Sequence, residues 1–78
     1  MTNEDKYIGA FAEALSVEAG QATALTYGQS SAWDSVGHMR LIANLEDAFD
    51  LMMDMDDIID FSSFMKGKEI LRKYDVDI

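Results

Sequence analysis

The residues of this chain best suited to chemistry lie together at positions 34–38, where Asp34 and Ser35 are followed by His38. A serine hydroxyl can act as a nucleophile, but no Gly-x-Ser-x-Gly turn surrounds Ser35 and no Asp–His arrangement orients His38. If Ser35 opens a helix, free N–H groups and the helix dipole favour an anion there. A phosphate ester on Ser35 would be well placed there, but plain helix capping by Asp34 or Ser35 is the more common role of such a pair.

A second cluster of reactive types is acidic and suggests calcium at first sight: Asp54, Asp56, Asp57 and Asp60. It does not fit the calcium-binding loop of an EF-hand. Ile59 stands where that loop needs glycine, and Met65 stands where it needs a bidentate glutamate. We therefore expect solvated acidic surface that also contacts partners, and no metal site.

The elements that position these residues are predicted to be four helices, over residues 3–17, 35–50, 56–60 and 63–74. Asn3 is the expected N-cap of the first, and Ser62 or Ser63 that of the fourth. No strand pattern competes. The prediction is one all-α domain over 1–78, a small four-helix bundle with three longer helices, a short third helix and a long ordered first loop. Gly67, inside the fourth helix, indicates a close approach or a tolerated defect.

The second helix has two apolar faces. One is a core stripe formed by Leu41, Ile42, Leu45 and Phe49. Nearly opposite lies a smaller strip of Val36, Met39 and Ala43, framed by the charges of Arg40, Asp47 and Asp50. This strip is either a docking face or a set of ordinary scattered surface residues.

Composition limits the possible functions. The chain has 78 residues, no Cys and a net charge of −9, which disfavours nucleic acid and anionic membranes as partners and favours basic protein surfaces. Most of this charge lies in residues 34–60, where Arg40 is the single cation. The polar N-terminus is unlike a signal peptide, and no apolar run is long enough to span a membrane. We expect a cytoplasmic monomer that binds or carries rather than catalyses.

The runs WDSVGHMRLI (33–42) and LEDAF (45–49) resemble the signature of acyl carrier proteins, and the likeness in length, acidity and helix order extends over nearly the whole chain. The resemblance implies that Ser35 carries 4'-phosphopantetheine, delivered from coenzyme A by a phosphopantetheinyl transferase. It implies that Asp34 helps this transferase engage the site and that Val36 replaces the usual Leu. The positions of the family that contact partners correspond to Met39, Ala43, Glu46 and Asp47.

The resemblance also implies a function. The arm would hold acyl intermediates as thioesters and deliver them to partner enzymes in fatty-acid, polyketide or related biosynthesis. These acyl-loading and acyl-processing enzymes would bring basic patches to an acidic face that includes Asp50, Asp56 and Asp57. Arg40, where fatty-acid members have an acid, and Trp33, where they have a small residue, indicate a specialised, stand-alone carrier.

Two arrangements are open for the cargo: it folds back between the helices, or the core is fully packed, which is the more common role of such apolar residues. The residues that could line such an acyl pocket are Leu41, Ile42, Leu45, Phe49, Ile58, Ile59, Phe61, Phe64 and Leu71. A fully packed core without a pocket is the alternative. For the chain as a whole, the alternative is a non-catalytic helical interaction module, with Ser35 as an unmodified cap, that docks a basic partner through its acidic second helix.

Overall fold

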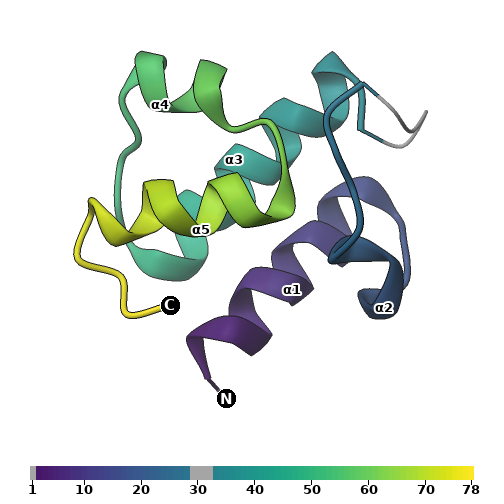
Figure 1. Cartoon of the computed structure of the whole chain (residues 1–78), viewed down its shortest axis with the longest axis horizontal. Helices are drawn as coiled ribbons and strands as arrows, with labels where there is room; N and C mark the ends of the chain where they lie inside the picture. Colours follow the sequence, from purple (N-terminus) through teal and green to yellow (C-terminus); the bar gives the residue numbers. More distant parts are fainter. Residues whose placement is uncertain (1, 29–32) are drawn as a thin grey trace.

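Five helices make up the computed structural model, which describes residues 2–28 and 33–78 (Figure 1). They are α1 (Asn3–Leu15), α2 (Ala19–Ala22), α3 (Ser35–Phe49), α4 (Met55–Asp60) and α5 (Phe64–Arg72). The described residues contain no strand, only an isolated bridge between Thr26 and Ser63. The all-α prediction is confirmed.

The four predicted helices form where they were expected, with ends that differ by at most two residues from the prediction. The fifth helix is a correction, because α2 lies in the segment 18–33 that was predicted as loop throughout. Local hydrogen bonding explains it: the Glu18 N–H donates to the side chain of Gln21 at 3.1 Å, and Ala22 is fully buried. Residues 29–32 of that predicted loop lie outside the described residues.

Short side-chain hydrogen bonds start three of the helices. Thr2, rather than Asn3, caps α1 by accepting from the Asp5 N–H at 3.1 Å. Ser63 caps α5 by accepting from the Lys66 N–H at 3.0 Å. Asp34 caps α3, where its Oδ1 accepts from the Gly37 N–H at 2.8 Å. Because the carboxylate does this work, the hydroxyl of Ser35 is not needed for capping.

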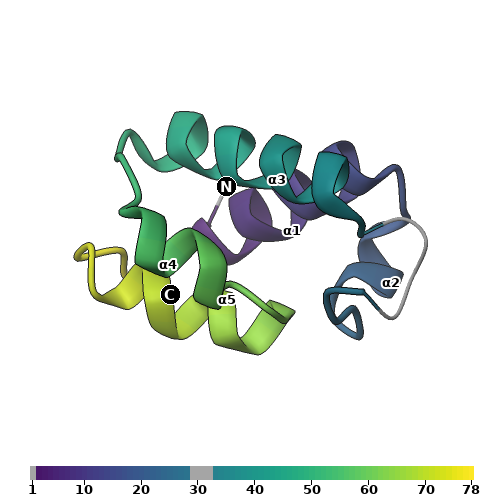
Figure 2. The same cartoon turned by 90° about the horizontal axis from the view of Figure 1, so that it is seen from above.

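An aromatic cluster forms the centre of the core. It joins Tyr7 and Phe11 of α1 to Trp33 before α3, and to Phe61 and Phe64 around the start of α5. All five rings are buried. Figure 2 shows α1 lying beside α3, with α4 and α5 toward the other side of the molecule. The first turn of α3 and the end of α4 are thereby held around the same aromatic centre.

Gly67 permits a close approach inside this core, as one of the two interpretations of the sequence predicted. A Cβ added there would lie 2.2 Å from both Phe61 Cζ and Tyr7 Oη. The Tyr7 hydroxyl donates to the Phe64 carbonyl at 2.5 Å, and burial raises the pKa of Tyr7. Glycine is therefore required so that the Tyr7 ring and the segment after α4 can both lie against α5.

Candidate functional site

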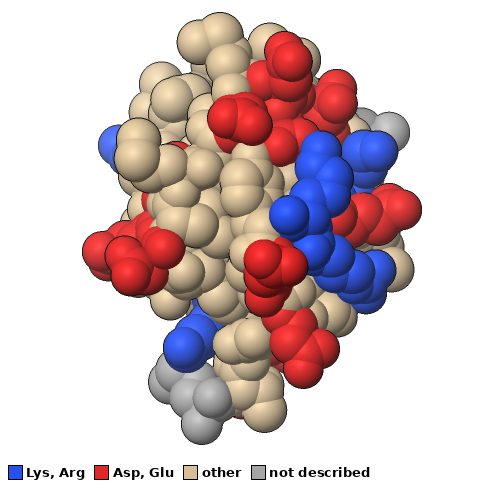
Figure 3. All heavy atoms as spheres, turned by 90° about the vertical axis from the view of Figure 1, so that its left-hand side faces the viewer, with Lys and Arg blue, Asp and Glu red and all other residues tan. Residues whose placement is uncertain are grey.

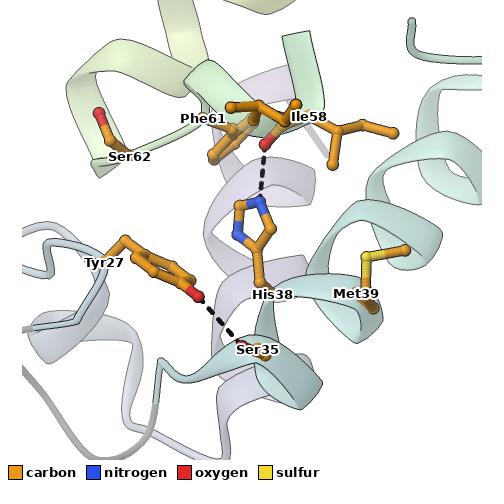
Figure 4. Close-up of a pocket in the computed structure, with 8 residues that line it drawn as sticks. Tyr27, Ser35, His38, Met39, Ile58, Phe61 and Ser62 are labelled. Atoms are coloured by element: carbon orange, nitrogen blue, oxygen red, sulfur yellow. Dashed lines mark hydrogen bonds between the residues drawn. The ribbon is translucent and has the colours of Figure 1, made fainter. Parts of the chain in front are cut away.

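Ser35 is the first residue of α3 and is exposed to solvent. Its Oγ lies 3.3 Å from the hydroxyl of Tyr27, which approaches from the segment before α3 (Figure 4). That segment is held in place because the Tyr27 N–H donates to the Ser62 carbonyl at 2.8 Å. The hydroxyl of Ser35 is thus accessible, does not cap the helix and lies next to Tyr27, whose backbone is held by the Ser62 carbonyl.

His38 lies one turn further along α3 and has a defined tautomer. The Trp33 indole N–H donates to Nδ1 at 3.0 Å, so Nδ1 must carry a lone pair and the proton must be on Nε2. Nε2 then donates to the Ile58 carbonyl at 2.7 Å. Because both ring nitrogens are engaged, neither is available as a base for Ser35, and the arrangement lacks the geometry of a serine hydrolase.

A hollow of about 410 Å³ opens beside Ser35 (Figure 4). Its wall comes from the first turns of α3, the end of α4 and the two connecting segments that approach them. The lining residues are Tyr27, Ser35, His38, Met39, Ile58, Ile59, Phe61 and Ser62. Apart from three hydroxyls and the occupied imidazole, these side chains are apolar, so the hollow suits a small apolar group.

The predicted acyl pocket is only partly reproduced by this hollow. Ile58, Ile59 and Phe61 line it, whereas the remaining predicted residues do not. Leu41, Ile42, Leu45, Phe64 and Leu71 are buried in the core, and Phe49 packs against that core. For these residues the structure shows the packed core, which was the alternative to a pocket between the helices. The aromatic cluster fills the space that such a pocket would need.

Besides Ser35, predicted as the attachment site, four lining residues were not among those predicted for a pocket: Tyr27, His38, Met39 and Ser62. His38 falls on the core side of the helical period of α3, so the sequence already placed it toward the interior at the start of that helix. Met39 was predicted as a partner contact instead. Tyr27 and Ser62 lie in connecting segments, where periodicity carries no information, so only the tertiary structure brings them to the site.

Most residues predicted to contact partners are exposed. Val36 and Met39 are 60% and 58% exposed, and they stand beside Ser35 at the start of α3. The others that are exposed are Arg40, Ala43, Asp47, Asp50 and Asp56. Glu46 is half-buried, and its carboxylate accepts from the Met53 N–H at 2.8 Å. The strip along α3 therefore faces solvent around the candidate site.

Asp57 differs from its predicted role as a partner contact, because it is only 6% exposed. Its carboxylate accepts from the Lys73 ammonium and from the Tyr74 hydroxyl, each at 2.5 Å. These hydrogen bonds, that of Lys73 foremost, lower the pKa of Asp57. Asp57 therefore ties α4 to the end of α5 instead of presenting its charge to a partner.

The charges of the surface are unevenly placed. Figure 3 views the molecule from the left-hand side of Figure 1 and shows most of the cations gathered along one edge, on the side where α5 lies. The cations of that region are Lys66, Lys68, Arg72 and Lys73. Two of them are paired with acids, Lys68 with Glu4 and Lys73 with Asp57. The basic edge is thus partly neutralised within the molecule itself.

No protein-family model, curated protein or solved structure matches this chain. Within residues 2–28 and 33–78, no group of three or more His, Cys, Asp or Glu side chains is placed to hold a metal ion. The helices described here are all too short or too polar to cross a membrane. A functional assignment therefore depends on the residues and geometry of the site itself.

Proposed function

We propose that this chain is an acyl carrier protein in which Ser35 carries a 4'-phosphopantetheine arm. The observation that carries the proposal is the position of Ser35. Its hydroxyl is exposed at the start of a 15-residue helix, Asp34 performs the capping, and an apolar hollow opens beside it. A serine that only began a helix would need neither a hydroxyl free of capping nor an apolar hollow beside it.

The site fits a phosphodiester-linked arm on electrostatic and steric grounds. The first-turn N–H groups of α3 favour an anion at Ser35. The Tyr27 hydroxyl, 3.3 Å from Ser35 Oγ, is within reach of an oxygen attached there. When bound, the arm supplies a terminal thiol that holds acyl cargo as a thioester. The chain has no Cys of its own, so the arm would be the source of thiol chemistry.

Attachment would be a phosphoryl transfer on the Ser35 hydroxyl. In the site of a phosphopantetheinyl transferase, Ser35 Oγ forms a bond to the phosphorus that bears the pantetheine of coenzyme A. The pyrophosphate P–O bond breaks, and adenosine 3',5'-bisphosphate leaves. The hydroxyl proton passes to a base of the transferase, because His38 has both nitrogens engaged.

Counting α1, α3, α4 and α5, the molecule would be a small four-helix bundle with α2 inserted in its long first connection. We propose a monomeric, cytoplasmic carrier and not an enzyme, which serves acyl-loading and acyl-processing enzymes with basic docking patches. Acidic residues such as Asp47, Asp50 and Asp56 would attract those patches and still permit rapid release.

A second candidate is a helical interaction module with an unmodified Ser35. The exposed strip of Val36, Met39 and Ala43 favours it, because these residues would dock a partner whether or not an arm is attached. The two candidates differ in whether an arm is covalently attached to Ser35, so a measurement of the protein's mass distinguishes them.

The test is to incubate the purified protein with a broad-specificity phosphopantetheinyl transferase and coenzyme A, and to measure its intact mass. We expect the mass to increase by one phosphopantetheine group in the native chain and to stay constant in Ser35→Ala. Because Ser35 does not cap α3, the variant should fold normally by circular dichroism. An unchanged native mass, or a gain that persists in Ser35→Ala, contradicts the carrier assignment and leaves the interaction module.

A further inference from the structure

The inner side of the hollow is a wall formed by His38 and Phe61. The imidazole of His38 reaches from α3 to the carbonyl of Ile58 near the end of α4, as Figure 4 shows. Phe61 follows α4 directly, and its ring lies 6.2 Å from that of His38 in an edge-on arrangement. Both side chains line the hollow. Together they stand between the hollow and the helix core.

Behind this wall the core is filled with aromatic rings. The ring of Trp33 stacks on that of His38, with 6.1 Å between the ring centroids. It packs edge-on against Phe11, with 5.3 Å between the centroids. The ring centroid of Phe11 in turn lies 6.0 Å from that of Phe61 and 5.2 Å from that of Phe64. Protein interiors are packed closely enough that a guest chain must displace side chains to enter. Passage from the hollow toward Leu41 and Leu45 would therefore require this cluster to separate.

The wall is held in position by hydrogen bonds as well as by packing. Trp33 donates to one nitrogen of His38, and the other nitrogen donates to Ile58. A side chain swinging away would leave the buried Trp33 N–H and the Ile58 carbonyl without these partners, which costs free energy. The outer rim is different, because Met39 and Ile59 are 58% and 71% exposed and can adjust to an occupant.

We infer that cargo on the Ser35-linked arm folds back into this outer hollow, and that the wall of His38 and Phe61 restricts it to compact acyl groups, meaning short chains or a single ring. The inference rests on the proposed carrier function and names its substrate class. The size of the hollow supports it, since about 410 Å³ lies near the lower end of the range for small-molecule sites. The rings of Tyr27, His38 and Phe61 offer faces and edges that suit a flat occupant.

The test is a series of loaded proteins. A broad-specificity transferase attaches acetyl-, butyryl-, benzoyl-, octanoyl- and dodecanoyl-phosphopantetheine from the corresponding acyl-coenzyme A, and intact mass confirms each product. The melting temperature is then compared with that of the protein carrying the bare arm. We expect butyryl and benzoyl cargo to raise it by several degrees, because they bury apolar surface. Octanoyl and dodecanoyl cargo should add nothing further.

Two results would overturn the inference while leaving the carrier function intact. One is a melting temperature that keeps rising through dodecanoyl, together with NMR shifts of the Leu41 and Leu45 methyl groups. The other is a melting temperature that no cargo changes, which would show that the hollow receives none. Failure of the proposed function is recognised separately, because then no mass gain occurs at all.

Substitutions in the wall and on the rim of the hollow test which residues set the size limit for the acyl cargo. His38→Ala removes half of the wall, and we expect the stabilisation to extend to octanoyl cargo. Met39→Ala is the matched control on the exposed rim, and it should weaken the effect of every cargo without moving the size limit. If His38→Ala does not fold, His38→Gln replaces it, because glutamine keeps a donor for the Ile58 carbonyl. The melting temperatures of the acyl-loaded native protein still decide whether a size limit exists. A folded His38→Ala with the native limit contradicts the role of the wall.

Discussion

At the scale of single residues, Asp34 and Ser35 have separate tasks. The Asp34 carboxylate accepts from the Gly37 N–H at 2.8 Å and so satisfies one of the free donors of the first turn of α3. Ser35 makes its side-chain contact with Tyr27 instead. An Asp–Ser pair can therefore serve folding through its first member and modification through its second.

Substitutions at Asp34 test this division. Asp34→Ala should lower the free energy of unfolding by about 1 kcal/mol, because the cap is lost. Asp34→Asn should keep most of that stability, since asparagine caps equally well, and lose only the weaker attraction of a carboxylate to the helix dipole. Urea denaturation of both variants measures the difference. An equal loss of unfolding free energy in Asp34→Asn and Asp34→Ala would show that the charge of Asp34, rather than its capping hydrogen bond, stabilises α3.

At the scale of elements, α4 is unusual because its one buried residue is the charged Asp57. Polar contacts hold α4 at both ends. Tyr74 accepts from the Asp54 N–H at 2.8 Å and donates to Asp57, and His38 binds the Ile58 carbonyl at the other end. Hydrogen bonds thus fix the position of α4, while packing of Phe61 in the aromatic cluster secures the other part of the wall.

The pH dependence of stability should report on the Asp57 contact. The pKa of Asp57 is lowered in the folded state, so its contribution is fully present above the ordinary aspartate pKa of about 3.9 and is lost as the pH falls through the folded value. Melting temperatures of the native protein and Asp57→Asn should differ most near neutral pH and converge below about pH 4. A constant difference from pH 7 to pH 3 would contradict this.

Two glycines provide a matched test of helix packing. Gly67→Ala in α5 should destabilise the protein by about 1–3 kcal/mol despite the better helix propensity of alanine, because its Cβ would lie 2.2 Å from Phe61 and Tyr7. Gly9→Ala in α1 meets no atom within 4 Å, so it should stabilise by about 0.5–1 kcal/mol. Chemical denaturation gives both values. Changes of the same sign would mean that the close approach at Gly67 has no energetic effect.

At the scale of the whole molecule, the charges are unevenly distributed. Most cations of the α5 region gather along one edge with acids beside them (Figure 3), whereas residues 34–60 carry eight acids and Arg40 as their single cation. Arg40 is the exception, since it is exposed among acids and forms no ion pair within the part of the chain that the structure describes. It lies beside Met39, so a partner that docks on this strip meets a positive charge.

Arg40 should therefore influence partner choice. We expect Arg40→Glu to increase transfer rates with fatty-acid synthase enzymes whose docking patches are basic, because it replaces a repulsive charge with an attractive one. The gain should shrink as salt is raised from 50 to about 500 mM, since salt screens exposed charges. Arg40→Gln is the neutral control and should fall between the two. Unchanged rates would mean that Arg40 does not select partners.

The sequence alone predicted four of the five helices, because helix formation depends on patterns of residues close together in the chain. Apolar spacing and capping residues located α1, α3, α4 and α5, and the Asp–Ser pair at residues 34–35 marked the start of α3. Charge counting identified Arg40 as the single cation of residues 34–60. These features depend on neighbours within a few positions, so they can be recognised without knowing how the chain folds back on itself.

Only the tertiary structure decided where the space beside Ser35 lies. Tyr27 and Ser62 reach the hollow from connecting segments, and His38 is fixed by Trp33 and Ile58, which lie 5 and 20 residues away. Leu41 and Leu45, apolar like the lining residues, are instead buried behind the aromatic cluster. An apolar pattern tells which face of a helix is buried, but whether that face meets a neighbour or a hollow depends on volumes contributed by distant residues.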